Sequence, residues 1–329
     1  MKWMSDITIH PLPMPIQHLH KVLMVGSCFT EHISKSLREL IFNVLENPNG
    51  IIFETKSVCR SLVSYVQDRR YTPADLFQLN ELYHSWDHHG RFSHPDEAAC
   101  LQQINESQER AHAFVLEADW LIITLGSSFV YRLYETRADV ANCHKAPGQW
   151  FEKYLVPIEE QVALLDNCIH QLFHANTKLK IIFTISPVRH LRDGVVDNNR
   201  SKARLIETVH HLVQKFDRIF YFPAYELVMD VLRDYRFYDV DLAHPNYAAT
   251  QFVMEKFSDF AFTDDTRALN QELRQLQLAR NHRPFHAASQ QHLKFLEAKL
   301  AKTRELAQRY GYLDLSELEV YFSSQIAHN

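Results

Sequence analysis

Five short apolar runs, separated by segments with helical periodicity, limit what this chain can fold into. The runs lie at residues 21–25, 42–45, 120–125, 180–185 and 218–222. They lack the regular polar alternation of a strand that has one face in solvent. Helical spacing of apolar residues follows at 30–41, 56–68, 97–117, 157–175, 201–216 and 246–261. The pattern predicts a central parallel β-sheet covered by helices on both faces, which is a three-layer α/β/α fold.

Glycine is scarce, with 7 residues among 329, and no two glycines lie near each other. This excludes the glycine-rich loops that bind dinucleotides or nucleotide phosphates, because those loops need clustered glycines. Three of the seven, Gly26, Gly50 and Gly126, follow the first three predicted strands. Parallel sheets place their functional sites at the carboxyl ends of strands, so these glycines mark where to search.

Charge and cysteine content exclude further classes of protein. The net charge of −5 provides no basic surface for nucleic acid or for an anionic membrane. The N-terminal residues contain no apolar secretion signal, and no apolar run has the length of a transmembrane helix. Five widely spaced cysteines without a C-x-x-C pair argue against a disulfide framework. We therefore expect a cytoplasmic protein.

The character of the chain changes near residue 263. We expect a catalytic domain at residues 1–262 and a helical appendage at residues 263–329. Two polar amphipathic helices are predicted at 264–280 and 287–310, with a turn at 281–284. They form either a hairpin packed on the first domain or an arm through which the protein oligomerises.

The turn after the first strand combines a hydroxyl, Ser27, and a thiol, Cys28. We expect Thr30 to be the N-cap of the following helix. A thiol near a helix N-terminus has a lowered pKa, which favours the nucleophilic thiolate. The alternative is a structural cysteine beside a capping serine.

A second candidate pair, Asp241 and His244, lies just before the helix predicted at 246–261. In this arrangement the imidazole acts as a general base, while the carboxylate fixes its tautomer and orientation. The spacing is common by chance in a chain with 20 histidines. It becomes informative only together with the Ser27–Cys28 turn.

Together these motifs resemble those of the GSCFA family, within the SGNH (GDSL) hydrolase superfamily. Residues 26–30 read Gly-Ser-Cys-Phe-Thr and match the family's name motif at four of five positions, with Thr30 in place of alanine. The stretches 47–51, 141–145 and 225–245 also look like that family. The resemblance covers roughly residues 20–260 and implies a flavodoxin-like three-layer domain.

The resemblance implies a role for each residue of the two motifs. Cys28 occupies the nucleophile position of the first superfamily block, and Ser27 stands where that block has aspartate. Asp241 and His244 match the last block as orienting acid and base. Capsule-polysaccharide acetyltransferase-like proteins, a neighbouring group, also carry cysteine at the nucleophile position. Cys28 is the expected nucleophile, and Ser27 is the alternative.

An oxyanion hole is also implied by the resemblance. Gly50 and Gly126 match the glycines of the second and third blocks, whose backbone N–H groups stabilise the developing negative charge. Ser128 stands at the third-block asparagine position, which is a departure from the pattern. Asn142 is a candidate substitute for that missing amide.

Two further segments carry candidate binding residues. The histidine-rich stretch at residues 84–94 offers possible metal ligands, but its spacing matches no established zinc pattern. We expect a loop at the mouth of the site, with His89 contributing to substrate binding and no bound metal. Arg189 and His190 follow the fourth strand and are candidates to contact an anionic substrate group.

These expectations favour an acyl-ester hydrolase or acyltransferase without a cofactor. The implied partner is a small-molecule or carbohydrate acyl ester, with acyl-CoA as another candidate donor. Two alternatives stay open: a non-catalytic ligand-binding module on the same fold, and a metal-dependent enzyme that uses the loop from His84 to His94.

Overall fold

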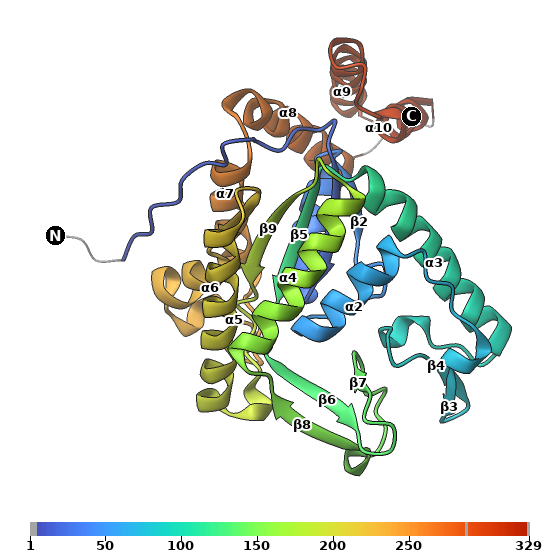
Figure 1. Cartoon of the computed structure of the whole chain (residues 1–329). Helices are drawn as coiled ribbons and strands as arrows, with labels where there is room; N and C mark the ends of the chain where they lie inside the picture. The colour runs from blue at the N-terminus through green and yellow to red at the C-terminus, as the bar shows by residue number, and fades with distance from the viewer. Residues whose placement is uncertain (1–4, 287–288, 328–329) are drawn as a thin grey trace.

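The centre of the molecule is a five-stranded parallel sheet (Figure 1). The computed structural model describes residues 5–286 and 289–327. The strands follow the order β2-β1-β5-β9-β10, and every neighbouring pair is parallel. Their bounds are β1 Lys21–Gly26, β2 Asn43–Glu46, β5 Trp120–Leu125, β9 Lys180–Ile185 and β10 Ile219–Phe222. All five predicted strands and the parallel sheet are confirmed.

Helices cover both faces of this sheet, which confirms the three-layer α/β/α prediction. On one face lie α1 (Cys28–Glu39) and α7 (Tyr247–Ala261). The opposite face carries α2 (Thr55–Val66), α3 (Glu97–Glu117), α4 (Ile158–Ala175) and α5 (Val195–Lys215). Successive strand side chains enter opposite layers, so Met24 packs with α1 while Val25 packs with α2. This double burial explains why the strands show no polar alternation.

Several short elements surround the carboxyl ends of the strands. The antiparallel strands β6 (Phe129–Leu133), β7 (Asp139–Val140) and β8 (Phe151–Leu155) form a small sheet that projects beyond β5 (Figure 1). A hairpin joins β3 (Phe77–Leu79) to β4 (Leu82–His84). Single helical turns occupy Pro73–Asp75, Gly90–Phe92, Gly148–Trp150, Leu191–Asp193, Ala224–Glu226, Leu227–Leu232 and Tyr235–Phe237. None of these short elements was predicted from the sequence, because their apolar runs are brief.

The predicted helix ends differ from the observed ones mainly at N-termini. The expectation that Thr30 caps the first helix is wrong: the N-cap is Ser27, whose Oγ accepts from the Phe29 N–H at 3.3 Å. Thr30 is instead buried in the first turn. Helix α5 begins at Val195, six residues before its predicted start. Within the described ranges, no helix combines the length and apolar character needed to cross a bilayer.

Three helices, α8 (Asp264–Asn281), α9 (Gln290–Arg309) and α10 (Ser316–Ala327), follow the sheet domain (Figure 1). Helix α10 was not predicted, and it packs along α9 and α8. Residues 287–288, at the predicted start of the second helix, lie outside the described residues. Leu273 of α8 and Phe322 of α10 belong to the same apolar core as Met24 of the sheet. The C-terminal helices therefore share one core with the α1 face.

Gly26 allows β1 and β5 to approach closely where the site begins. Its φ is 151°, and a Cβ there would lie 2.3 Å from the carbonyl oxygen of Thr124. We expect Gly26→Ala to lower the free energy of unfolding by about 2–4 kcal/mol, because alanine is strained at this φ and its Cβ would clash with the Thr124 carbonyl oxygen. Urea denaturation measures this change.

Gly148→Ala is the matched control, because nothing lies within 4 Å of the added Cβ and φ is not in the left-handed region. This variant should change the free energy of unfolding by less than about 0.5 kcal/mol. Equal stability of the two variants would contradict the close-approach explanation.

Candidate active site

Ser27 and Cys28 stand at the junction between β1 and α1. The Ser27 N–H donates to the Thr124 carbonyl oxygen at 3.2 Å, and the Gly26 N–H donates to Asn47 Oδ1 at 2.9 Å. These bonds hold the end of β1 against its two neighbouring strands. Cys28 is consequently the first residue of α1, where the leading N–H groups of a helix lack intrahelical partners.

The environment of the Cys28 thiol differs from the expectation. Burial raises the pKa of Cys28, and the nearby Glu31 carboxylate raises it further. The backbone N–H groups of Phe29 and Cys28, together with Lys202, act in the opposite direction but do not prevail. The prediction of a lowered pKa was therefore wrong, because desolvation outweighs the helix N-terminus here. The thiol is neutral at pH 7 and needs a base to become nucleophilic.

Lys202 of α5 is a further candidate, which was not among the residues predicted from the sequence. Its side chain is buried, and Nζ donates to the carbonyl oxygens of Gly126 (2.6 Å) and Ser186 (2.7 Å). Burial lowers the pKa of Lys202 to about 7, while attraction to Cys28 opposes this shift. A sequence signal existed, because Lys202 lies on the same helical stripe as the apolar Leu205. When protonated, Lys202 places a positive charge that favours the Cys28 thiolate.

Asp241 and His244 form the expected pair. Nδ1 of His244 lies 2.6 Å from Oδ2 of Asp241, and Oδ1 accepts from the N–H groups of Ala243 (2.9 Å) and His244 (3.0 Å). These two backbone bonds, followed by the imidazole bond, lower the pKa of Asp241 to about 2. The carboxylate is therefore ionised at neutral pH and orients the imidazole through Nδ1, which leaves Nε2 for a reacting group.

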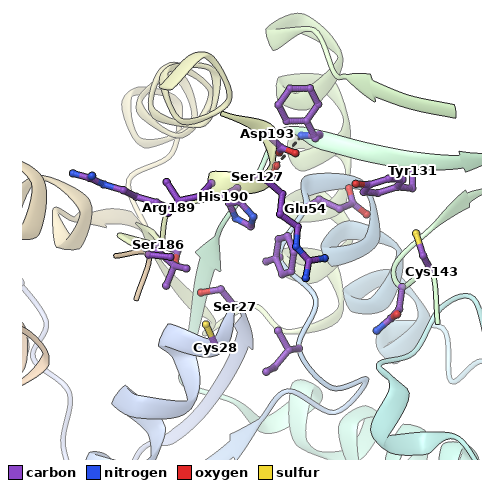
Figure 2. Close-up of a pocket in the computed structure, with 18 of the residues that line it drawn as sticks. Ser27, Cys28, Glu54, Ser127, Tyr131, Cys143, Ser186, Arg189, His190 and Asp193 are labelled. Carbon is purple, nitrogen blue, oxygen red and sulfur yellow. Dashed lines mark hydrogen bonds between the residues drawn. The ribbon is translucent and has the colours of Figure 1, made fainter. Parts of the chain in front are cut away.

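The loop that carries this pair is tied to the end of β9. The Arg189 N–H donates to the Ala243 carbonyl oxygen at 3.1 Å. The Arg189 guanidinium lies over the Tyr238 ring at 4.8 Å and extends away from the cavity (Figure 2). This side chain therefore supports the loop. The guanidinium does not point into the cavity, so this arrangement gives no support to the predicted contact between Arg189 and an anionic substrate group.

One cavity of about 780 Å³ brings most of the predicted residues together. Figure 2 shows Ser27 and Cys28 on one side, with Tyr131 and Cys143 across from them. The predicted residues that line this cavity are Ser27, Cys28, His89, Asn142, Arg189, His190, Asp241 and His244. These side chains come from loops far apart in the chain that converge at the carboxyl edge of the sheet. The thiol and the Asp–His pair thus share one space.

The predicted oxyanion donors Gly50, Gly126 and Ser128 do not line this cavity. The Gly50 N–H donates to the Asn47 carbonyl oxygen at 2.7 Å, and the Gly126 N–H donates to that of Phe53 at 2.8 Å. Both N–H groups therefore already donate to backbone carbonyls. The expectation that Gly50 and Gly126 form the oxyanion hole is wrong.

Ser128 is buried, and its Oγ donates to the Ser201 carbonyl oxygen at 2.9 Å. Its neighbour Ser127 lines the cavity instead. The two glycines serve close packing: a Cβ on Gly50 would lie 2.2 Å from His89 Cβ, and one on Gly126 would lie 3.1 Å from Phe53.

Asn142 lies at the cavity wall. Its Oδ1 accepts from the His144 N–H at 2.8 Å, which fixes the orientation of the side-chain amide. An N–H₂ group held in this way is a candidate donor to a developing negative charge.

His89 and His190 also line the cavity, and both are neutral at pH 7. Burial lowers the pKa of His190 to about 4, with Lys202 adding to the effect. Burial likewise lowers the pKa of His89, and its Nδ1 accepts from the Arg91 N–H at 3.4 Å. These imidazoles can exchange hydrogen bonds with a substrate, but they do not offer it a positive charge.

The histidine-rich segment uses its imidazoles within the protein. His84 bonds Ser93 Oγ (2.6 Å) and the Leu79 carbonyl oxygen (3.0 Å), while His88 bonds Ser85 Oγ (2.9 Å). Over residues 5–286 and 289–327, no group of three or more His, Cys, Asp or Glu side chains is arranged to hold a metal ion. The segment therefore supports the wall of the site through packing, and it gives no support to the metal-dependent alternative.

Fold and site together define an α/β protein with a cysteine and an Asp–His pair at the carboxyl edge of its sheet. The model of the GSCFA family matches residues 21–257. A second model, described as the C-terminal domain of GSCFA domain proteins, matches residues 273–328. The chain belongs to the GSCFA family. A search of curated proteins finds no match.

Alkylation by iodoacetamide tests the electrostatics of the thiol. Because burial raises the pKa of Cys28, its labelling rate should still increase as the pH rises above 9, with no plateau near neutrality. Below about pH 7, where Lys202 carries its charge, Lys202→Met should slow labelling, because the charge that favours the thiolate is lost. Peptide mapping by mass spectrometry separates Cys28 from the other cysteines.

Circular dichroism provides the folding control for Lys202→Met. A labelling rate for Cys28 that levels off at or below pH 7 would contradict this description of the site.

Proposed function

We propose that this protein is an acyl-ester hydrolase or acyltransferase with Cys28 as its nucleophile, on a fold of the SGNH type. The observation that carries this proposal is the shared cavity, which the Cys28 thiol and the Asp241–His244 pair line together. A nucleophile, a base and an orienting carboxylate in one space are the parts that acyl transfer requires.

Cys28 is a better candidate than Ser27. The Ser27 hydroxyl accepts the Phe29 N–H as the helix cap, and the residue is 4% exposed. Cys28 is more exposed and sits in the first turn of α1. A thiol is also easier to ionise than a hydroxyl, so it needs less assistance from the base.

The chemistry follows from these positions. His244 Nε2 takes the proton of the Cys28 thiol while Sγ attacks the carbonyl carbon of the ester. The tetrahedral intermediate collapses, the alkoxide leaves with the proton from His244, and an acyl thioester remains on Cys28. Water or an acceptor hydroxyl then attacks this thioester, with His244 taking its proton and returning it to the sulfur.

Negative charge that develops on the carbonyl oxygen needs hydrogen-bond donors. The Asn142 amide and the Cys28 N–H, at the positive end of α1, are the proposed donors. Lys202 contributes more remotely, because its charge favours the thiolate as leaving group in the second step.

A ligand-binding module without catalysis is the second candidate function. Burial raises the pKa of Cys28 and keeps its thiol neutral, and a cavity of about 780 Å³ lined by a neutral thiol can bind a small molecule without reacting with it. Turnover therefore decides between the two functions.

Steady-state hydrolysis of p-nitrophenyl acetate tests the proposal. We expect Cys28→Ala and His244→Ala each to lower kcat by about 10³-fold or more, and Asp241→Asn by a smaller factor. His211→Ala on the exposed face of α5 is the control and should retain full activity. Full activity of Cys28→Ala would overturn the assignment of the nucleophile.

The pH dependence provides a separate test of the orienting carboxylate. The pKa of Asp241 is held at about 2, so this carboxylate is ionised at both pH 5 and pH 8. Asp241→Asn should therefore lower kcat/KM by a similar factor at both pH values. Loss of the Asp241→Asn effect at pH 5 would show that the carboxylate is already protonated there.

A further inference from the structure

A second hollow, of about 600 Å³, lies beside the candidate active site. It runs along α1 and the start of α7 as far as α8. Its lining includes Ser36, His244, Tyr247, Gln251, Arg274 and Gln277. His244 lines both this hollow and the cavity that contains Cys28. The imidazole therefore stands between two spaces that a pair of substrates can enter separately.

The hollow is elongated. Along α1 its lining extends from His32 to Glu39, which spans about 10 Å of helix. Lys35, Glu39 and Gln277 also line a further hollow of about 730 Å³ beside α10, so the surface depression continues past α8. This shape suits a chain-like ligand better than a compact one.

The wall opposite α1 belongs to the C-terminal helices. Arg274, Gln277, Leu278 and Asn281 lie on α8, within the segment that the C-terminal family model matches. The hollow is therefore built jointly from the two matched segments, with the base of the proposed reaction at one end. This location gives the C-terminal helices a role beyond packing.

The lining combines polar and apolar side chains, and its charges balance. Lys35 and Arg274 are offset by the carboxylates Glu39 and Asp239, with His32 as a further titratable group. A polyphosphate ligand would need an excess of cations. The Gln277 amide donates to the Glu39 carbonyl oxygen at 3.0 Å and so links α8 to α1. The side-chain amides of Gln251 and Asn281 can each donate and accept hydrogen bonds, as a ligand rich in hydroxyl groups requires.

An exposed aromatic ring in the hollow also favours a ligand rich in hydroxyl groups. Tyr247 is 79% exposed at the start of α7, next to His244 in the hollow. An aromatic face on the surface beside hydrogen-bonding amides suits the apolar face and hydroxyl edge of a sugar ring.

We propose that this hollow, the α1–α8 groove, binds the acyl acceptor and that the acceptor is a neutral carbohydrate chain. The proposal rests on the proposed acyl transfer through Cys28 and makes the protein a transferase. In the second step a sugar hydroxyl oxygen attacks the thioester carbon, and His244 takes the hydroxyl proton. The C–S bond breaks, and the thiolate recovers that proton as the sugar ester leaves.

The test uses the full chain with p-nitrophenyl acetate as donor and maltohexaose, cellohexaose or chitohexaose as acceptor. Released p-nitrophenol reports the first step, and mass spectrometry of the acetylated oligosaccharide reports transfer. We expect transfer to at least one acceptor. Tyr247→Ala and Gln251→Ala should each lower the ratio of transfer to p-nitrophenol release by about tenfold. Tyr134→Ala, on an exposed turn outside both hollows, should leave this ratio unchanged.

The outcomes separate the two proposals. Release of p-nitrophenol that depends on Cys28, without transfer to any of the three acceptors, overturns the acceptor groove and leaves the acyl-cysteine chemistry standing. Transfer that persists in Tyr247→Ala and Gln251→Ala also overturns the groove.

If the protein releases no p-nitrophenol, calorimetric titration with the same oligosaccharides still measures whether the groove binds them. Binding that Tyr247→Ala abolishes then supports the groove although the proposed function has failed, and absence of binding overturns it. Coenzyme A binding that is lost in Lys35→Ala or Arg274→Ala would assign the groove to the donor and overturn the proposal.

Discussion

The close contact between the carboxyl ends of β1 and β5 determines where the candidate site can form. Gly26 pairs with Thr124 in the parallel register, and its missing side chain lets the two backbones meet. Because β1 ends there, α1 begins at Cys28 with Ser27 as its cap. The thiol is thereby placed at the edge of the sheet where the order of strands reverses, which is where ligands bind in open α/β sheets.

Burial then controls the chemistry of this edge. It raises the pKa of the Cys28 thiol and lowers the pKa of the Lys202 amine, so both groups tend toward their neutral forms. Asp241 has the opposite character, because backbone N–H groups stabilise its charge in an exposed loop. An exposed Asp–His pair that shares a cavity with a half-buried thiol fits a site in which the base, and not the helix terminus, generates the nucleophile.

The sequence predicted the sheet well because its signal is strong and local. Five continuous apolar runs can be buried on both faces only in a covered parallel sheet. The family motifs pointed to Cys28, Asp241 and His244, and these three residues line one cavity in the structure. The start of α1 was misjudged because Ser27 and Thr30 are both good caps, and tertiary contacts at Gly26 decide between them. The raised thiol pKa could not be read from a turn motif, since it depends on burial by distant segments.

Gly50 and Gly126 were expected to present free N–H groups, yet their role is close packing against His89 and Phe53. Lys202 was missed although a lysine on an apolar helix stripe is a readable signal.

If Cys28 is the nucleophile, an acyl group becomes attached to its Sγ during turnover, and trapping this intermediate is the decisive measurement. The protein would be mixed with p-nitrophenyl acetate, quenched in acid within the first turnovers, digested and mapped by mass spectrometry. We expect one acetyl group on the peptide that contains Cys28, removable by neutral hydroxylamine as a thioester is. An acetyl group on Ser27, or turnover without any acyl adduct on Cys28, would contradict it.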